Sequence, residues 1–311
     1  MAKVITILLL LVCLFMLLWN TIVYNPKTDT GEYSIDNVRI YKGTLAWDLA
    51  KAVNNQDTKA INVILAKNPA ALDYQDPLYG TTLLFWSVGM EKYNSAETLL
   101  KAGANPDIIS VYEGVTALYI ASGYSYIDTH ANKDPKFVEL LLRYGADPNI
   151  GFVGSDHYNS PEIGTTPLME SIGCGIGKTK ALVAGGADIN FSTDRGMTAS
   201  LRSIWIANGA RSSVSVELEV TEYAYYLIVE NHSDISKPWL GRESGEPVYP
   251  VIFLRDWFMK LDDKGYQRKM EIIDEFNRQG FDYWSTPISN QQLLQIQRLY
   301  PNSWKEYIKR Y

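Results

Sequence analysis

The N-terminal part of the chain carries one long apolar run, and short apolar segments alternate with polar ones in the remainder. Residues 4–24 contain no charged side chain. About 20 such residues are enough for a helix to cross the hydrocarbon core of a bilayer. We therefore predict a signal-anchor transmembrane helix over residues 1–24. Residues 25–40 are polar and unpatterned, which predicts a short tether after it.

The flanks of this run predict its orientation. Lys3 precedes the run, and no small-x-small cleavage site follows it. Because positive charge stays on the cytoplasmic side, the body of the chain is expected on the outer side. The chain has no eukaryotic linker or sorting motif, which favours a bacterial, single-pass inner-membrane protein facing the periplasm. As an alternative, Leu11-Val12-Cys13 is similar to a lipobox, which would place an acyl chain on Cys13.

Beyond the tether, apolar segments recur with one shared start. Each start has a Gly, a Thr two residues later, and a Leu within the next three positions. Gly supplies a backbone conformation that a Cβ would strain, and Thr at this place predicts a helix N-cap. A small residue further on lets the neighbouring segment approach. The four starts are residues 80–87, 114–121, 164–171 and 196–203.

A shared ending closes these segments. Two apolar residues precede a Gly, and Asp or Asn follows it. The apolar pair predicts a second helix packed on the core, which Gly terminates in the left-handed region before the chain turns. The clearest endings are residues 99–107, 140–149 and 181–190, and weaker copies are residues 226–235, with His232 in place of the Gly, and residues 272–282. Residues 43–73 read as a degenerate first copy.

These starts and endings resemble the G-x-T-P-L-H-x-A and L-L-x-x-G-A-D-P-N patterns of the ankyrin-repeat family over residues 41–284. The resemblance implies an all-α fold, an α-solenoid of about six ankyrin repeats with hairpin fingers. Residues 285–311 are expected to form a C-terminal capping helix, broken at Pro301. The spacing of the starts departs from the family's period and predicts three insertions, at residues 125–136, 150–163 and 207–216.

Composition and charge narrow the range of partners. The chain has 311 residues, of which 46% are hydrophobic, and its net charge is −6. These are globular values, and no run of Lys and Arg offers the basic face that duplex nucleic acid needs. We therefore expect no nucleic-acid partner. Two cysteines do not make a disulfide framework, and Cys174 is expected to be a small buried core residue.

Catalytic and metal-binding patterns are weak in this sequence. Residues 173–179 contain Gly-Lys-Thr, but Ile172 stands where a phosphate loop needs its first Gly, which favours a turn between two helices. The three histidines lack the helical spacing of a zinc site, and no nucleophile elbow occurs. We predict a protein that is not an enzyme and has no cofactor or metal.

Aromatic residues in loops are the best candidates for partner contacts. Tyr and Trp dominate the energetics of many interfaces, and the chain has 21 Tyr and 8 Trp. Tyr112, Tyr124, Phe152 and Tyr158 fall in fingers or in loops between helices, where core packing does not claim all of them. The alternative for each is packing against the next finger.

The resemblance implies protein–protein recognition, and three hypotheses follow from it. The first is an immunity protein outside the cytoplasm that neutralises a secreted toxin. The second is a periplasmic accessory protein that assists a partner enzyme. The third, which no motif favours, is an enzyme whose site lies in the insertions.

Overall fold

The computed structural model describes residues 33–127, 133–155, 160–209, 218–241 and 245–311. The predicted signal anchor, residues 1–24, lies outside these ranges, and so do residues 25–32, the first half of the predicted tether. No helix within the described ranges has the length and apolar character to cross a membrane.

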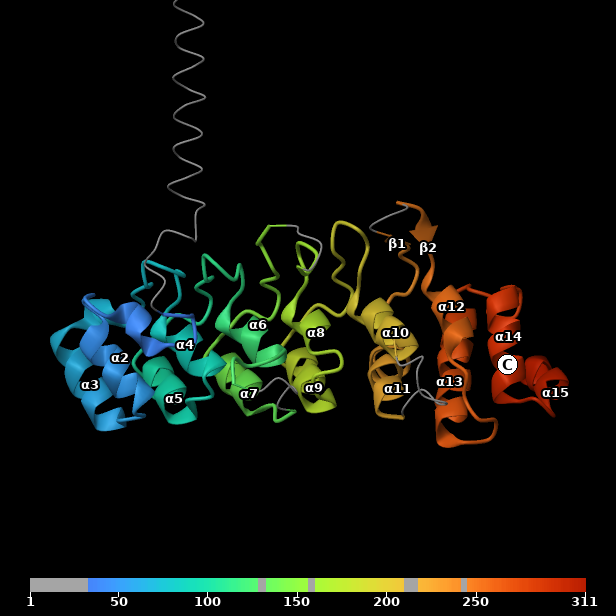
Figure 1. Ribbon diagram of the computed structural model, residues 1–311, viewed down its shortest axis with the longest axis horizontal. Helices are drawn as coiled ribbons and strands as arrows, with labels where there is room; N and C mark the ends of the chain where they lie inside the picture. The colour runs from blue at the N-terminus through green and yellow to red at the C-terminus, as the bar shows by residue number, and fades with distance from the viewer. Residues whose placement is uncertain (1–32, 128–132, 156–159, 210–217, 242–244) are drawn as a thin grey trace, which may run out of the picture.

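The described residues form a row of helix pairs, with fingers that project along one edge (Figure 1). Helices on the finger side contact one another from pair to pair, and so do the outer helices, which gives two layers. The six pairs are α2 (Trp47–Asn54) with α3 (Thr58–Lys67), α4 (Leu83–Gly89) with α5 (Tyr93–Lys101), α6 (Ala117–Ser122) with α7 (Lys136–Arg143), α8 (Pro167–Glu170) with α9 (Ile176–Ala184), α10 (Ala199–Gly209) with α11 (Leu218–Ala224), and α12 (Pro250–Phe253) with α13 (Lys264–Arg278).

Short elements complete the row. The 3-10 helices are η1 (Val38–Tyr41), η2 (Pro69–Ala71) and η4 (Leu254–Asp256), and η3 (Tyr225–Glu230) is a π-helix that continues α11. The antiparallel strands β1 (Trp239–Leu240) and β2 (Pro247–Val248) form the finger before α12. Two helices follow the last pair, α14 (Asn290–Leu299) and α15 (Trp304–Arg310). The helical fold with its hairpin fingers matches the prediction, and so does the break around Pro301.

The helix starts have the geometry that the sequence predicts. In each of the four starts the Thr side chain accepts a hydrogen bond from the backbone N–H three residues later, over 3.1–3.4 Å. The Gly two residues before each Thr has a positive φ, between +63° and +87°. At Gly114 a Cβ would lie 2.6 Å from the backbone nitrogen of Gly154, so both the backbone angle and the close approach require Gly.

The helix endings also match. Gly103, Gly145 and Gly186 follow their helices with φ between +85° and +94°. His232, which the sequence places at the same point of a weaker copy, has φ +50°. A non-Gly residue in this region carries strain, so the fold holds His232 in a conformation that the other endings give to Gly.

Two boundaries differ from the sequence-based prediction. The tether was expected to run to Ile40, but Ile40 is buried in η1, and the Tyr41 hydroxyl donates a 3.0 Å hydrogen bond to the Thr81 carbonyl. The folded body therefore begins before Tyr41. The insertion expected from residue 207 begins later, because α10 continues to Gly209; residues 210–217 lie outside the described ranges.

A hydrogen-bond ladder joins the fingers at their bases. In four successive junctions, an Asp or Asn side chain accepts a hydrogen bond from the backbone N–H of an Asp or Asn in the next repeat. These bonds run from Asn105 to Asp73, from Asp147 to Asp107, from Asp188 to Asn149 and from Asp234 to Asn190, over 2.8–3.1 Å. The same kind of hydrogen bond therefore joins the finger bases at each of these four junctions.

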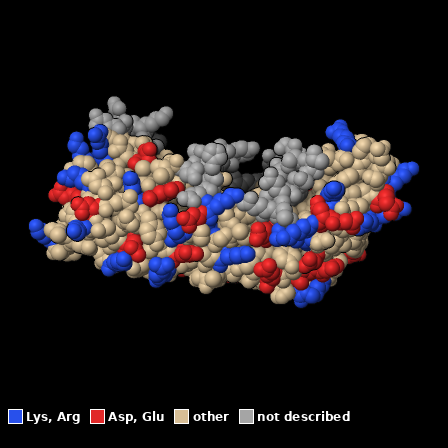
Figure 2. All heavy atoms as spheres, turned by 90° about the horizontal axis from the view of Figure 1, so that it is seen from below, with Lys and Arg blue, Asp and Glu red and all other residues tan. Residues whose placement is uncertain are grey.

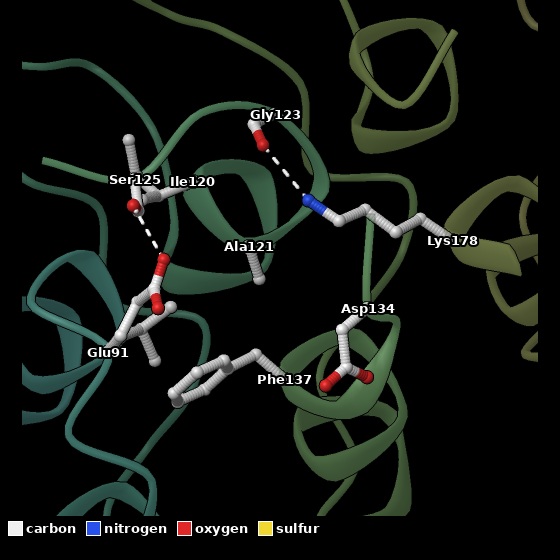
Figure 3. Close-up of a pocket in the computed structure, with 9 residues that line it drawn as sticks. Glu91, Ile120, Ala121, Gly123, Ser125, Asp134, Phe137 and Lys178 are labelled. Atoms are coloured by element: carbon white, nitrogen blue, oxygen red, sulfur yellow. Dashed lines mark hydrogen bonds between the residues drawn. The ribbon is translucent and has the colours of Figure 1, made fainter. Parts of the chain in front are cut away.

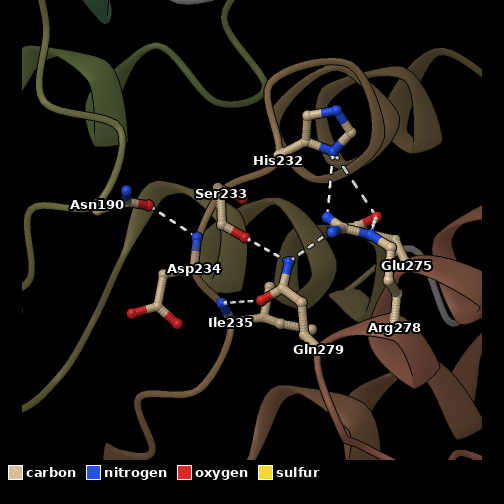
Figure 4. A network of polar contacts seen from close by, with 8 residues as sticks. All are labelled: Asn190, His232, Ser233, Asp234, Ile235, Glu275, Arg278 and Gln279. Atoms are coloured by element: carbon tan, nitrogen blue, oxygen red, sulfur yellow. Dashed lines mark hydrogen bonds and ion pairs between the residues drawn. The ribbon is translucent and has the colours of Figure 1, made fainter.

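The fifth and sixth repeats are joined in a different way (Figure 4). Ser236 stands where the ladder has Asp or Asn, and its backbone N–H donates to Asp234. The side chain of Gln279 makes the connection: its Nε2 donates to the Ser233 carbonyl over 3.0 Å, and its Oε1 accepts from Ile235 over 3.2 Å. Gln279 is held in turn by the buried carboxylate of Glu275.

Candidate partner-binding surface

Five fingers occupy one edge of the molecule (Figure 1). We name them in chain order: finger A is residues 73–80, finger B is 105–114, finger C is 149–164, finger D is 188–196, and finger E is 234–249. Within fingers C and E, residues 156–159 and 242–244 lie outside the described ranges.

Hydrogen bonds tie each finger to the next. Tyr112 of finger B donates its backbone N–H to a carbonyl of finger A over 3.0 Å, and Val153 of finger C donates to finger B over 2.9 Å. The hydroxyl of Thr193 in finger D donates to Glu162 of finger C over 2.8 Å. Leu240 of finger E donates to a carbonyl of finger D over 2.7 Å. The fingers therefore form one connected platform.

Apolar side chains stand exposed on this platform. Val111 is 79% exposed and Tyr112 is 59% exposed, both in finger B. Fingers A, C and E add further exposed apolar or aromatic residues, which are Leu78, Val153, Ile163, Leu240 and Tyr249. A single exposed apolar residue is ordinary, but a series on connected fingers is the kind of surface that binds another protein.

The four aromatic residues predicted to contact a partner differ in their exposure and in whether the structure describes them. Tyr112 is exposed and packs edge-to-face on Tyr79, with ring centroids 5.2 Å apart. Tyr124 is also exposed, just after α6. Tyr158 lies outside the described residues. Contact of these three with a partner stays a prediction.

Phe152 requires a correction, because it is only 6% exposed. Its ring fills the space beside the backbone of Gly154, where an added Cβ would lie 2.4 Å from the ring. Packing among the fingers, the alternative reading from the sequence, therefore describes Phe152. The sequence analysis left both readings open, because the contact depends on how finger C folds over finger B.

A polar cluster connects three repeats on the finger-side helices. Glu170 of α8 accepts hydrogen bonds from the Tyr119 hydroxyl of α6, over 3.2 Å, and from Arg202 of α10, over 3.0 Å. Burial, followed by the charge of Glu170, raises the pKa of the nearby Cys174 thiol. Cys174 is buried and its thiol stays protonated, which agrees with the expected core role and not with a nucleophile.

A small cavity lies beside this cluster, between the α4–α5 turn and the start of α7 (Figure 3). Lys178 crosses from α9, is almost fully buried, and donates a 3.0 Å hydrogen bond to the Gly123 carbonyl. Opposite it, Ser125 donates to Glu91 over 2.8 Å. The cavity measures about 20 Å³, which is room for a water and not for an organic substrate.

Residues 173–179, which partly resemble a phosphate loop, form the turn between α8 and α9 and the start of α9. Gly173 and Gly175 have φ of +91° and +123° in the turn between α8 and α9, as the helix-turn interpretation predicts. The backbone N–H of Gly175 donates to the Tyr223 hydroxyl over 2.8 Å. Because this amide and the Lys178 ammonium both bind protein groups, the turn joins repeats and does not present a phosphate cradle.

Sequence reasoning missed a tryptophan pair at the fifth repeat. Trp205 of α10 and Trp239 of finger E have ring centroids 5.0 Å apart, and Trp205 is 43% exposed. A signal was present in the sequence: nine residues after the start glycine, the second to fourth repeats carry Gly89, Gly123 and Gly173, and the fifth carries Trp205. A bulky aromatic at a position otherwise held by Gly stands out from the helix.

Charges of both signs intermingle on the face away from the fingers, over the part that the described residues form (Figure 2). Many lie within ion-pair distance, such as Lys101 with Glu97 of α5 at 3.0 Å and Lys180 of α9 with Glu222 of α11 at 3.8 Å. This face does not present the single-sign patch that duplex nucleic acid selects. Among the described residues, no group of three or more His, Cys, Asp or Glu could hold a metal ion.

Comparison with known families bears on the repeat between fingers B and C. The model of the ankyrin repeat family matches residues 113–151, which span α6, α7 and the bases of both fingers. The chain carries an ankyrin repeat. This match supports the ankyrin-repeat family, and the caps, endings and fingers of the neighbouring pairs have the same geometry. No curated protein matches the chain. Ankyrin repeats are generally protein-interaction modules without catalytic activity.

Proposed function

We propose that this protein binds another protein through its fingers and finger-side helices and does not act as an enzyme. The observation that carries the proposal is the connected finger platform, on which Val111 and Tyr112 stand exposed. A surface fixed by hydrogen bonds loses little conformational entropy when a partner binds, which favours affinity. Tyr112 supplies the rigid aromatic contact area that interfaces favour.

We further propose that the body is held at the outer face of the inner membrane of a bacterium, in the periplasm. The support is in the sequence: residues 4–24 carry no charge, and Lys3 precedes them. Fractionation of cells that express the full chain tests this. Protease added to spheroplasts should digest the body, and a body protected until the membrane is lysed would refute the orientation.

For the partner, we propose a secreted toxin that this protein neutralises, in the manner of an immunity protein. The net charge of −6 suits a basic partner. An accessory role for a periplasmic enzyme is the second candidate, because the same surface would hold an enzyme equally well. Adjacent genes distinguish the two: a toxin gene supports immunity, and a gene for another enzyme supports the accessory role.

A membrane pull-down with mass spectrometry tests the binding function. The tag belongs at the N-terminus, because Tyr311 is buried. The wild type should capture one stoichiometric partner, and Val111→Asp should reduce the capture by about tenfold or more. Val63→Asp is the matched control, because Val63 is an exposed valine on the outer helix α3. Equal capture by wild type and Val111→Asp would show that finger B is not the interface.

A further inference from the structure

Among the described residues, the carboxylate of Glu162 in finger C has hydrogen-bond donors but no Lys or Arg as an ion-pair partner. Its Oε1 accepts a hydrogen bond from the indole Nε1 of Trp239 over 3.1 Å, and its Oε2 accepts from the Thr193 hydroxyl over 2.8 Å. Both donors are neutral. Within the described ranges no Lys or Arg forms an ion pair with Glu162, although Glu162 is partly buried. A partly buried carboxylate without a cation is stabilised by any positive charge that approaches it.

The tryptophan pair adds a second attraction for the same charge. Trp239, which Glu162 fixes by its indole N–H, packs on Trp205 with the two rings tilted by 43°. Trp205 is 43% exposed. The face of an indole attracts cations, and a planar guanidinium stacks on it more closely than an ammonium does. The nearest basic residue along α10 is Arg202, and it is bound to Glu170.

We propose that Trp205, Trp239 and Glu162 receive an arginine side chain of the protein partner. The inference rests on the proposed binding function and names the chemistry of one contact within it. The guanidinium stacks on the exposed indole of Trp205, and the Glu162 carboxylate supplies the opposite charge. Because fingers C, D and E all hold this group in place, the site is formed before the partner arrives.

The test uses two fluorescein-labelled peptides, Gly-Gly-Arg-Gly-Gly and the same peptide with citrulline, a neutral analogue of arginine. Fluorescence anisotropy with the purified full chain in detergent micelles measures both affinities. The arginine peptide should bind about tenfold more tightly than the citrulline peptide. Glu162→Gln and Trp205→Ala should each reduce this preference to about twofold or less, and Trp205→Phe, which keeps a ring, should retain more of it.

Two matched variants control for general effects. Trp284→Ala removes a tryptophan that is 46% exposed outside the site. Glu271→Gln removes a carboxylate that, like Glu162, accepts from a neutral donor, the Tyr225 hydroxyl. Circular dichroism confirms that each variant is folded. Equal affinity of the wild type for the two peptides overturns the proposal, and so does an equal loss in the controls.

The pull-down separates this inference from the binding function on which it rests. If Val111→Asp loses the partner and Glu162→Gln keeps it at wild-type level, the arginine site is wrong and the binding function stands. If the wild type captures no partner while the arginine preference depends on Glu162, the site exists and the binding function is wrong.

Discussion

The second to fourth repeats and the C-terminal region are built on different principles. In the former, apolar side chains fill a single core that extends from Ile40 to Leu227, and the Asp and Asn ladder joins each finger to the next. In the latter, the core is divided into two further clusters and three charged side chains are buried, whereas Asp76 and Lys178 are the charged side chains buried in and beside the second to fourth repeats, among the described residues. Arg255, Lys269 and Glu275 are all buried there.

The buried cations of the C-terminal region are held by aromatic rings and carbonyl groups. Arg255 lies 3.9 Å from the ring centre of Tyr283 and donates to the carbonyls of Tyr283 and Tyr311. Lys269 lies 4.0 Å from the ring centre of Tyr311 and donates to the Trp257 carbonyl over 3.1 Å. Identical junctions between repeats can all use the same hydrogen bond, whereas the last repeat has no following repeat to pack on and is covered by different contacts.

Of the variants that test this difference, Arg255→Ala should have the largest effect on stability. The change leaves two buried carbonyls without their donor and removes the cation from the Tyr283 ring, so we expect a loss of about 3–5 kcal/mol in the free energy of unfolding. Urea denaturation measures it, with the exposed Arg143→Ala on α7 as control. Hydrogen exchange should show the loss first in α13 to α15. Stability equal to the control would refute a structural role for the buried cation.

The junctions can be compared directly with Gln279→Ala and Asn149→Ala. Gln279 makes two hydrogen bonds to the fifth repeat, at Ser233 and Ile235, so its loss should cost about 2 kcal/mol. Asn149 is one member of a ladder, and its replacement should cost about 1 kcal/mol. Thermal unfolding followed by circular dichroism measures both. Equal losses would mean that the two kinds of junction contribute alike.

The pH dependence of stability should differ between the wild type and Lys269→Met. Burial, and then the charge of Arg255, hold the pKa of Lys269 well below its ordinary value of 10.5. The unfolded chain therefore binds the extra proton at pH values between the folded pKa and 10.5, so the contribution of Lys269 to stability rises with pH in that window. The limiting slope is about 1.4 kcal/mol per pH unit.

Urea denaturation at several pH values below 10 measures this difference, because tyrosine ionisation in the unfolded state opposes it above that pH. The wild type should gain stability relative to Lys269→Met as the pH rises. Parallel profiles for the two proteins would mean that Lys269 keeps the same pKa in the folded and unfolded states.

The smallest effect should be the same in both regions. Thr116 caps α6 and Asp263 caps α13, each by accepting a backbone N–H, over 3.3 Å and 2.7 Å. Thr116→Ala and Asp263→Ala should each cost about 1 kcal/mol, because a helix cap depends on its own first turn and not on the repeat. A loss above about 3 kcal/mol in either variant would show that the cap also fixes tertiary contacts.

Local backbone requirements explain why much of the fold was predictable. A Gly with positive φ, a Thr cap and a Leu pair are each needed within a few residues, so the helix starts and endings could be located from the chain alone, even at His232. The turn at Gly173 and the break at Pro301 follow from the same kind of local constraint. The exposure of Tyr112 and Tyr124 could also be predicted from the sequence, because both residues lie in loops.

Tertiary structure decided what depends on contacts between distant residues. Phe152 is buried because finger C folds over finger B, and Lys178 reaches Gly123 across 55 positions of the chain. Trp205, Trp239 and Glu162 come together only because three repeats stack in register. Side-chain identity fixes what a residue can bind, but long-range packing determines which neighbours it meets and whether it stays exposed. The sequence by itself therefore determined the repeats, and the stacking of those repeats decided the composition of the binding surface.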